Sequence, residues 1–498
     1  MKLVNVLRTV ALACVLVATP ALAGEQHARD AISITHGVAT GDVTSHSAVI
    51  WSRGSGEGYM HVQVHGPRHG ANVYAVPVVA EDDFTGKVSI DGLRPDQDYT
   101  YTVWFSEQRH AGHAREGATG RFHTAPEDST SRPVTFAWGG DVAGQNVCRD
   151  IDEGFPIFNA VNSLRPDFFI GLGDMIYADG TCEATGRYGN TQVPGDFIPS
   201  ADLDNYWAHW KYSREDEAFR ELLGNTAYVA IWDDHEVVND FGPLHDTRNT
   251  APYTPGEHLL PLGLQAFLDY NPVAESGLTP DRLYRSLRWG KHLELIVLDN
   301  RQYRDANLEE DDDTLVKTML GREQLTWLKD TLRKSDATWK VIVSSVPMSI
   351  PTGFPPQNGR DGWANYDQEK GFERELLEIL GFLHEQDERN VVFITTDVHF
   401  AEVFRYTPFA EDPGFQIHEV VTGPMNAGLF PNRNFDVTLS PESLFFYGPA
   451  SSDAVTTYEQ ARRWMNFGAA TIDAQGNLTL SVMDVDGKPV YTTELIPK

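Results

Sequence analysis

The sequence FFIGLGDMIY, residues 168–177, is an apolar strand-like run that ends in Gly173, Asp174 and Tyr177. A second run, VVFITTDVH at residues 391–399, ends in a similar way, with Asp397 and His399. Carboxylate, phenol and imidazole groups that leave a sheet at strand ends suit a two-metal hydrolytic site. The sequence therefore predicts an enzyme.

The first residues have the pattern of a secretory signal peptide. Lys2 and Arg8 precede the apolar run 10–17, and Ala-Leu-Ala follows it up to Ala23. This order matches the charged, apolar and small-residue regions of an export signal. We expect residues 1–23 to be a Sec-type signal peptide, because the twin-arginine pair is absent. No later run approaches the about 20 apolar residues of a membrane span, so we expect a periplasmic or secreted protein.

Acidic residues dominate the composition. The chain has 40 basic and 71 acidic residues and a net charge of −31. Without the predicted signal peptide, which holds two basic residues and no acidic ones, the net charge is 38 − 71 = −33. A field of this sign repels polyanions and attracts divalent cations. We therefore expect no extended nucleic-acid binding through a basic patch.

The mature chain is longer than one hydrophobic core normally supports, so we expect two domains. Apolar and polar residues alternate over 60–64 and 99–105, which indicates an antiparallel β domain. A Leu-Arg-Pro sequence ahead of Tyr99 resembles the tyrosine corner of immunoglobulin-like and fibronectin-like sandwiches, where a phenol bonds nearby backbone. The predicted sandwich covers residues 31–123, and the Pro-containing segment 124–133 is expected to be a linker.

From residue 134 onward, strand-like apolar runs alternate with helical ones. Residues 134–138 form the first predicted strand, a helix is expected at 157–164, and a strand follows at 168–172. Further strands are expected at 228–232, 293–298, 340–346, 391–395 and 417–421. Such alternation is typical of an α/β domain, which we expect over residues 134–498. Asp486-Gly487 predicts a hairpin near its end.

Polar residues follow these apolar runs directly. They are Asp141, Asp174, the block Asp233–Glu236, Asp299 and Asp397. A single Asp at a strand end is usually a cap or turn residue. Because ligand sites in open α/β sheets gather outside the carboxyl ends of strands, repetition at five strand ends predicts one shared site.

These motifs resemble the alkaline phosphatase D, or PhoD-like, family, within the calcineurin-like and purple-acid-phosphatase-like metallophosphoesterases. The resemblance covers nearly the whole mature chain. It rests on HGVATGD (36–42), AVIWSR (48–53), LGDMIY (172–177), WDDHEVVN (232–239), LDNRQYR (298–304) and TDVH (396–399). It implies an α/β metallophosphoesterase domain, a β-sandwich flanked by helices, preceded by a smaller all-β sandwich.

The resemblance also implies a set of metal ligands. Asp174 would bridge two metals, and Tyr177 would supply a phenolate to a ferric ion. His399 would bind on the iron side and Asp397 on the second metal, to which Asn239 would add an amide oxygen. The family resemblance implies calcium as the second metal. Hard oxygen ligands suit Ca²⁺, and a phenolate with an imidazole suits Fe³⁺.

One position departs from the family pattern. The family commonly has a cysteine thiolate near the end of the first strand, where this chain has Gly139-Gly140-Asp141. Asp141 would keep a negative ligand in that place. A carboxylate there tolerates Mn²⁺, Zn²⁺ or Fe²⁺ as well as Fe³⁺, so the sequence leaves the identity of the first metal open.

The implied reaction is hydrolysis of a phosphate ester by a metal-activated hydroxide, with no protein nucleophile. His235 is the candidate for protonating or hydrogen-bonding the leaving oxygen, with Asp234 as its orienting partner or a further metal ligand. The alternative is a histidine that only fixes the loop. Arg301 and Arg304 either clamp a phosphate in bidentate fashion or pair with the strand-end Asp299 that precedes them and fix a loop.

Two cysteines remain after the predicted signal peptide. Cys148 and Cys182 lie a few residues beyond the presumed ligands Asp141 and Tyr177, on consecutive strands of one predicted βαβ unit. Because export leads to an oxidising compartment, we predict a disulfide that joins the two ligand loops. Two buried free thiols are the alternative.

The leading hypothesis is an exported, metal-dependent phosphodiesterase and phosphomonoesterase that acts on a small-molecule, lipid or polymer phosphate ester. One alternative is a phospholipase D type of activity on phospholipid head groups. Another is a non-catalytic protein that binds phosphate esters or envelope polymer. The sequence does not determine the natural substrate, the diester or monoester preference, the oligomeric state or the role of the N-terminal sandwich.

Overall fold

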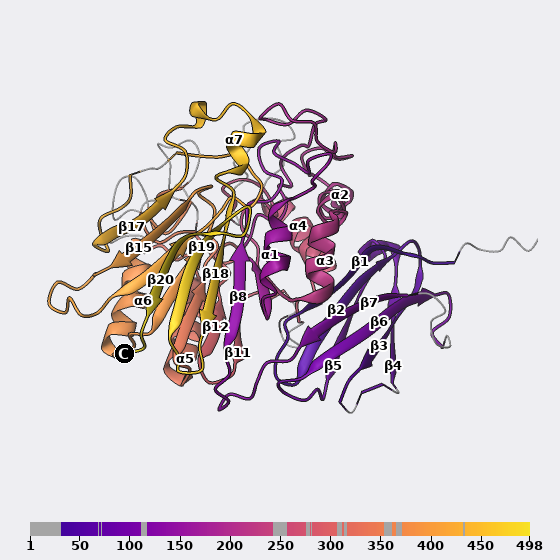
Figure 1. Ribbon diagram of the computed structural model, residues 1–498, viewed down its shortest axis with the longest axis horizontal. Coiled ribbons are helices and arrows are strands. Elements are labelled where there is room, and N and C mark those ends of the chain that lie inside the picture. Colours follow the sequence, from indigo (N-terminus) through magenta and orange to yellow (C-terminus); the bar gives the residue numbers. More distant parts are fainter. Residues whose placement is uncertain are drawn as a thin grey trace, which may run out of the picture. The chain divides into compact units, whose positions relative to one another are not determined.

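Three β-sheets and the helices that cover them organise the chain in the computed structural model (Figure 1). The structure describes residues 31–67, 69–70, 72–110, 117–242, 256–274, 279, 281–305, 311–312, 316–352, 361–364, 371–431 and 434–498. Ile32–Lys498 form one compact unit. The signal peptide predicted for residues 1–23 lies outside the described residues. None of the helices in the described ranges is long and apolar enough to cross a membrane.

The N-terminal region is built from seven strands in two sheets. They are β1 (Ile34–Gly41), β2 (Ser47–Gly54), β3 (Gly58–His65), β4 (Val73–Val78), β5 (Thr85–Asp91), β6 (Asp98–Ser106) and β7 (Ala118–His123). One sheet has the order β4-β3-β6-β7, while β1, β2 and β5 belong to a larger sheet. Met60 and Val62 of β3 are buried in the same core as Ile50 and Val88. The alternation predicted for 60–64 and 99–105 is therefore confirmed as strand structure.

Tyr99 makes the hydrogen bond that a tyrosine corner requires. Its hydroxyl accepts from the backbone N–H of Arg94 at 2.9 Å and lies 3.3 Å from the carbonyl oxygen of Pro67. The ring is buried and stacks on Phe122 at 5.4 Å. The immunoglobulin-like or fibronectin-like identity of this region stays a prediction.

The larger sheet runs continuously from the N-terminal strands into the rest of the chain. Its order is β20-β19-β18-β8-β9-β10-β1-β2-β5. Strand β1 pairs in parallel with β10, with Thr40 opposite Ala227 and Gly41 opposite Tyr228. The strands not yet given are β8 (Val134–Gly139), β9 (Phe168–Gly171), β10 (Ala227–Ala230), β18 (Asn466–Ile472), β19 (Leu478–Asp484) and β20 (Pro489–Leu495). The predicted Asp486-Gly487 hairpin joins β19 to β20.

The remaining sheet has seven strands in the order β11-β12-β13-β14-β16-β15-β17. They are β11 (Arg285–Trp289), β12 (Leu293–Val297), β13 (Trp339–Val343), β14 (Val391–Thr395), β15 (Ala401–Tyr406), β16 (Ile417–Val421) and β17 (Pro441–Tyr447). Strands β12, β13, β14 and β16 are mutually parallel. The α/β pattern predicted from residue 134 onward is thus divided between two sheets.

Helices pack against the nine-stranded and the seven-stranded sheets. They are α1 (Ile157–Leu164), α2 (Leu203–Arg214), α3 (Glu217–Asn225), α4 (Gly256–Tyr270), α5 (Gly321–Lys334), α6 (Glu373–Glu385) and α7 (Tyr458–Arg462). Asp202 and Asp216 cap α2 and α3 by accepting from backbone N–H groups at 2.9 and 2.8 Å, which satisfies donors that lack a partner within the helix. Phe158 of α1 stacks on Phe219 of α3 at 4.4 Å.

Side-chain alternation divides the core into two layers. In β13, Val341 and Val343 belong to the core shared with the nine-stranded sheet, whereas Ile342 belongs to the core formed with α5 and α6. Successive residues of a strand point to opposite faces, so both faces of this sheet are buried. Continuous apolar runs are what such strands require, and this is why their positions were predictable.

The predicted disulfide is present between Cys148 and Cys182. Both residues are buried, and they lie in the loops that follow β8 and β9. A covalent link between these two loops restricts the conformations of the unfolded chain. It also joins the two segments that carry Asp141 and Tyr177.

Candidate metal centre

Four strand-end acids of the predicted site converge at the carboxyl ends of parallel strands from two different sheets. Asp141 and Asp174 follow β8 and β9, Asp233 follows β10, and Asp397 follows β14 of the other sheet. The loops after β8 and β9 are hydrogen-bonded, because the N–H of Val142 donates to the carbonyl of Asp174 at 2.7 Å. Ligand sites favour this position in α/β sheets.

Within the described part of the chain, four groups of side chains bring possible ligand atoms within 4.8 Å of one another. The first contains Asp141, Asp174 and His399, and the second contains Asp174, Asp234 and His235. The third group is Asp174, Asp233, Asp234 and Asp397, and the fourth is Asp234, Asp240 and Asp361. Asp174 belongs to three of the four, which is the arrangement that a bridging carboxylate requires.

The backbone at this centre adopts conformations that ordinary residues rarely accept. Asp141, Asp174, Asp397 and His399 have φ angles of 59°, 53°, 81° and 61°. A left-handed conformation in a non-glycine residue costs free energy and persists where the surrounding structure imposes it. Strain repeated at four residues of one cluster indicates a functional site.

Buried carboxylate oxygens without partners test whether the centre fits metal ions. Among the described residues, Asp141 Oδ1, Asp174 Oδ2, Asp233 Oδ2 and Asp397 Oδ2 are buried and accept no hydrogen bond. Leaving such oxygens unsatisfied is unfavourable, and a cation would satisfy several at once. The donor set of carboxylates, a phenol and an imidazole therefore fits bound metal.

Burial and mutual repulsion shape the electrostatics of the centre. Burial raises the pKa of Asp141 to about 8. Burial, reinforced by the neighbouring carboxylates Asp234 and Asp233, raises the pKa of Asp174 well above its ordinary value. Burial and the charge of Asp233 do the same for Asp397. Without cations, this centre holds protons; with cations, it must release them.

Tyr177 and His399 occupy the same side of the centre as Asp141. The Tyr177 hydroxyl lies 2.8 Å from His399 Nε2, and His399 Nε2 lies 3.8 Å from Asp141 Oδ1. The other ring nitrogen of His399 faces the carbonyl of Gly428, which directs Nε2 toward the cluster. Burial and the nearby carboxylate of Asp174 raise the pKa of Tyr177, so a phenolate form needs a compensating cation.

Two glycines make room for these side chains. A Cβ at Gly144 would lie 2.4 Å from Cζ of Tyr177. Gly423 has φ of 120°, and a Cβ there would lie 2.1 Å from Asp141 Oδ2. That oxygen accepts a hydrogen bond from Thr396 Oγ1 at 2.9 Å, which leaves Oδ1 as the oxygen available to a metal.

His235 is held by Asp179, a residue that the sequence prediction missed. The imidazole Nδ1 lies 2.6 Å from Asp179 Oδ1, whereas Asp234 accepts hydrogen bonds from backbone N–H groups of His235 and Asp240. The prediction of Asp234 as the orienting partner is therefore wrong. Its alternative role as a further ligand stays a prediction, and Asp234 belongs to three of the four groups.

The environment of His235 favours its protonated form. Burial lowers the pKa of His235, but the charges of Asp179 and Asp234 outweigh burial and raise it to about 10. The same contact lowers the pKa of Asp179, against the effect of its own burial. An imidazolium held at Nδ1 is suited to donate a proton from its other nitrogen.

Arg301 lies in the interior and pairs with carboxylates. Its Nε donates to Asp233 Oδ1 at 2.6 Å, and its Nη atoms donate to both oxygens of Asp361 at 2.6 and 3.0 Å. Arg304 is also buried, 3.5 Å from Asp361 Oδ1. The structure thus places Arg301 as a clamp on two acids of the centre, which corrects the prediction of a phosphate clamp. Substrate binding by Arg304 stays a prediction.

Two other acids in the predicted motifs accept hydrogen bonds, mainly from backbone N–H groups. Asp299 accepts from Trp232 Nε1 and from the N–H groups of Arg301 and Gln302, each at 3.0 Å. Glu236 accepts from the N–H groups of Asp174, Met175 and Asp233 at 2.8–3.0 Å. Both oxygens of each of these two acids accept hydrogen bonds, whereas Asp141, Asp174 and Asp397 each keep one oxygen without a partner among the described residues. The sequence carries no signal of that difference.

Asn239 is half-buried, next to the loop that holds His235. Its backbone N–H donates to Asp179 Oδ2 at 3.1 Å. The amide ligand expected at this position stays a prediction. Asp361 had no sequence signal at all, because it lies far along the chain from every predicted strand end.

Metal removal should make the stability of the protein depend on pH. Asp141 has a pKa of about 8 against an ordinary value of 3.8. The folded, metal-free protein therefore binds more protons than the unfolded chain between about pH 4 and 8, so its free energy of unfolding falls as pH rises through this window. We expect the unfolding midpoint of chelated protein to fall from pH 5 to pH 8.

Thermal unfolding with and without metal checks this expectation. Asp141→Asn removes the titrating group, so the chelated variant should show a smaller fall than the chelated native sequence. Restored metal should remove the fall, because bound cations require ionised ligands. A midpoint of the chelated native protein that stays level or rises with pH would contradict the protonated buried cluster.

Comparison with protein families assigns both parts of the chain to one group. The family model described as PhoD-like phosphatase matches residues 136–480, and the model for the PhoD-like phosphatase N-terminal domain matches residues 19–126. Alkaline phosphatase D of Bacillus subtilis (strain 168) is 28% identical over 416 residues, which cover 73% of this chain. The chain spans 64% of the length of that relative.

Two solved structures share the fold. The structure of PhoD aligns with a TM-score of 0.70 at 21% identity and covers 93% of this chain and 88% of its own. The purple acid phosphatase PPD1 from yellow lupin seeds aligns with a TM-score of 0.60 at 13% identity and covers 93% and 74%. At these identities the match shows the fold alone.

Proposed function

Because the chain belongs to the PhoD-like phosphatase family, we propose that it is a metal-dependent hydrolase of phosphate monoesters and diesters. The position of Asp174 carries the proposal. This buried carboxylate is shared by three groups of possible ligands, and its Oδ2 has no hydrogen-bond partner among the described residues. A single acid between two cation positions is what a two-metal phosphoesterase needs.

The side chains divide into two proposed coordination spheres. Asp141, Asp174, Tyr177 and His399 would hold the first metal, and Asp174, Asp397 and Asn239 the second. When bound, two cations neutralise the charge on a phosphoryl group and make a water more acidic. We propose Fe³⁺ beside Tyr177 and Ca²⁺ in the second position, with Mn²⁺ or Zn²⁺ as the alternatives for a first sphere that contains Asp141.

Groups around the proposed ligands support this assignment by restricting their orientation. Thr396 holds one oxygen of Asp141, and Gly428 directs the imidazole of His399. Arg301 binds Asp233 and Asp361 and reduces the repulsion among the acids. His235, held by Asp179, would donate a proton to the leaving oxygen of the ester.

Turnover assays on three substrates test the proposed function. We expect the metal-loaded protein to hydrolyse bis-aryl and mono-aryl phosphates, and Asp174→Asn to abolish this turnover because the shared ligand is lost. Asp196→Asn, an exposed acid outside the centre, serves as the matched control and should keep full activity. Preferential cleavage of phosphatidylcholine would instead favour the phospholipase alternative, and binding of esters without turnover would favour a non-catalytic protein.

The colour of the metal-loaded protein tests the proposed iron. A phenolate bound to Fe³⁺ should give a visible charge-transfer band, and metal analysis should find iron with calcium. Tyr177→Phe removes the phenol and should abolish the band. A colourless, fully active protein that contains Zn²⁺ or Mn²⁺ would exclude the ferric assignment.

The role of His235 predicts a dependence on the leaving group. Alkyl esters need a proton at the leaving oxygen, whereas nitrophenyl esters hardly do. Replacing His235 by Asn should therefore slow alkyl ester hydrolysis by about a hundredfold or more, with a much smaller effect on nitrophenyl esters. Asp179→Asn should produce the same selective loss to a lesser extent, because Asp179 positions the imidazole.

Parallel measurements of kcat for both ester types decide this point. Asp196→Asn is again the control, because the Asp196 carboxylate is exposed and lies outside the centre. An equal loss on alkyl and nitrophenyl esters in the Asp179→Asn variant would show that the pair only maintains the loop.

We further propose that the chain is exported after removal of residues 1–23 and folds as an N-terminal sandwich, 31–123, joined through 124–133 to the catalytic domain, 134–498. The N-terminal family model ends at residue 126 and the other begins at residue 136, so the gap between them overlaps the greater part of the proposed linker. The Cys148–Cys182 disulfide suits an oxidising compartment.

A further inference from the structure

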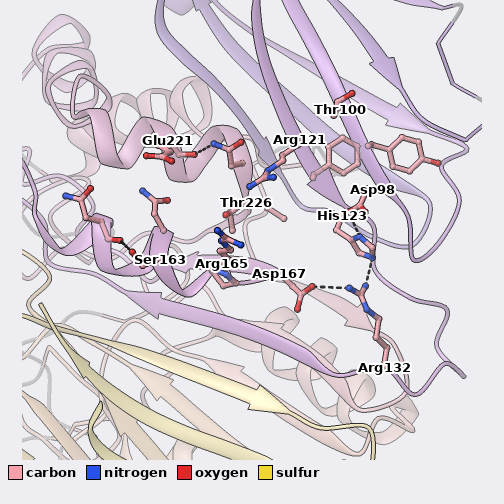
Figure 2. A pocket seen from close by; sticks show the side chains of 17 residues that line it. Asp98, Thr100, Arg121, His123, Arg132, Ser163, Arg165, Asp167, Glu221 and Thr226 are labelled. Carbon is pink, nitrogen blue, oxygen red and sulfur yellow. Dashed lines mark hydrogen bonds and ion pairs between the residues drawn. The ribbon is translucent and has the colours of Figure 1, made fainter. Parts of the chain in front are cut away.

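A large polar cleft lies between the N-terminal strands and the helices that follow β8 (Figure 2). Its volume is about 1040 Å³. One wall comes from β6 and β7, and the other comes from α1, the turn into β9, and α3. No residue of the candidate metal centre lines it, so the cleft is a separate feature of the molecule.

The two walls are held together by direct contacts. Arg132 Nη1 donates to Asp96 of the N-terminal region at 2.7 Å, and its Nη2 lies 3.6 Å from Asp167 on the opposite wall. The parallel pairing of β1 with β10 connects the same two regions through one sheet. The cleft is therefore built into the fold.

Two arginines enter the cleft from opposite walls. Arg121 comes from β7 and Arg165 from the turn after α1, and Figure 2 shows both side chains in the space between the walls. Both residues are exposed. Among the described residues, neither guanidinium has a carboxylate within ion-pair distance.

Two of the three acids that line the cleft contact other residues of its lining. Asp98 lies 2.8 Å from His123 Nδ1, and Asp167 accepts from the N–H of Thr135 at 2.9 Å and contacts Arg132. Glu221 on α3 is the remaining acid of the lining. The lining thus holds three guanidinium groups and three carboxylates, and Arg121 and Arg165 are the two guanidinium groups that make no ion pair among the described residues.

The chemistry of the lining indicates an anionic ligand. Guanidinium groups bind phosphate oxygens through paired N–H donors, which gives both affinity and orientation. A cleft of this volume matches an organic molecule better than a bare ion, and the amide of Asn159 adds a further polar group to its wall. We propose that the cleft is a second, non-catalytic binding site for an organic phosphate, with Arg121 and Arg165 as its anion-binding residues.

This inference does not depend on the proposed function. A site for organic phosphate away from the metal centre would bind its ligand whether or not the centre turns over. Its position between both walls would also let one ligand contact the N-terminal region and the helical layer together.

Equilibrium binding to the full-length, metal-loaded protein tests the proposal. Inorganic phosphate tests recognition of the anion alone, and phenylphosphonate tests an organic phosphate analogue that cannot be hydrolysed at a P–O ester bond. Calorimetry should detect a binding event in addition to that of the metal centre for both probes, with phenylphosphonate the tighter ligand. The double variant R121A/R165A should weaken this event by about tenfold or more, because charge-assisted hydrogen bonds are lost.

The matched control is R94A/R322A, which removes two exposed arginines outside the cleft and changes the net charge equally. It should bind both probes like the native sequence. Thermal unfolding of both double variants verifies that they remain folded. Unchanged binding in R121A/R165A, or an equal loss in both double variants, would overturn the site; tighter binding of inorganic phosphate than of phenylphosphonate would overturn the organic ligand.

Discussion

Repulsion among buried carboxylates is the constraint around which the centre of this protein is built. Asp141, Asp174, Asp233 and Asp397 each have a buried oxygen without a partner among the described residues, and these oxygens lie in the same interior region. Water cannot relieve this repulsion in a buried site, and protons or cations must do so. Burial is the main cause of the raised pKa values of Asp141 and Asp174, and neighbouring carboxylates add to it. The backbone of Asp141, Asp174 and Asp397 is left-handed.

Neighbouring residues hold this unfavourable arrangement in place. Glu236 binds the backbone of the loops after β9 and β10, and Arg301 places its fixed positive charge between Asp233 and Asp361. The Cys148–Cys182 disulfide joins the loops after β8 and β9. These groups contact the proposed ligands or the loops that carry them, and they are not proposed as ligands themselves. Precise ligand geometry in metal sites commonly depends on such supporting contacts.

Much of this was predictable, for identifiable reasons. Strands buried on both faces must be continuous apolar runs, so β14 and β16 were predicted with the bounds that the structure has. A residue that directly follows such a strand, such as Asp174, can be located from the sequence in the same way. Asp179 and Asp361 lack it, because they lie in loops whose paths depend on contacts with distant segments.

The sequence by itself determined most of the residues proposed for the centre, because strand-end acids, a tyrosine and a histidine stand in motifs that identify the family. Only the tertiary structure decided what each of them does. Asp299 supports a turn, Arg301 binds acids, and Asp179 rather than Asp234 orients His235. The physical reason is that a side chain's role depends on which of its polar atoms remain free. Which polar atoms remain free depends on neighbouring residues that are distant in the sequence and that two sheets bring together.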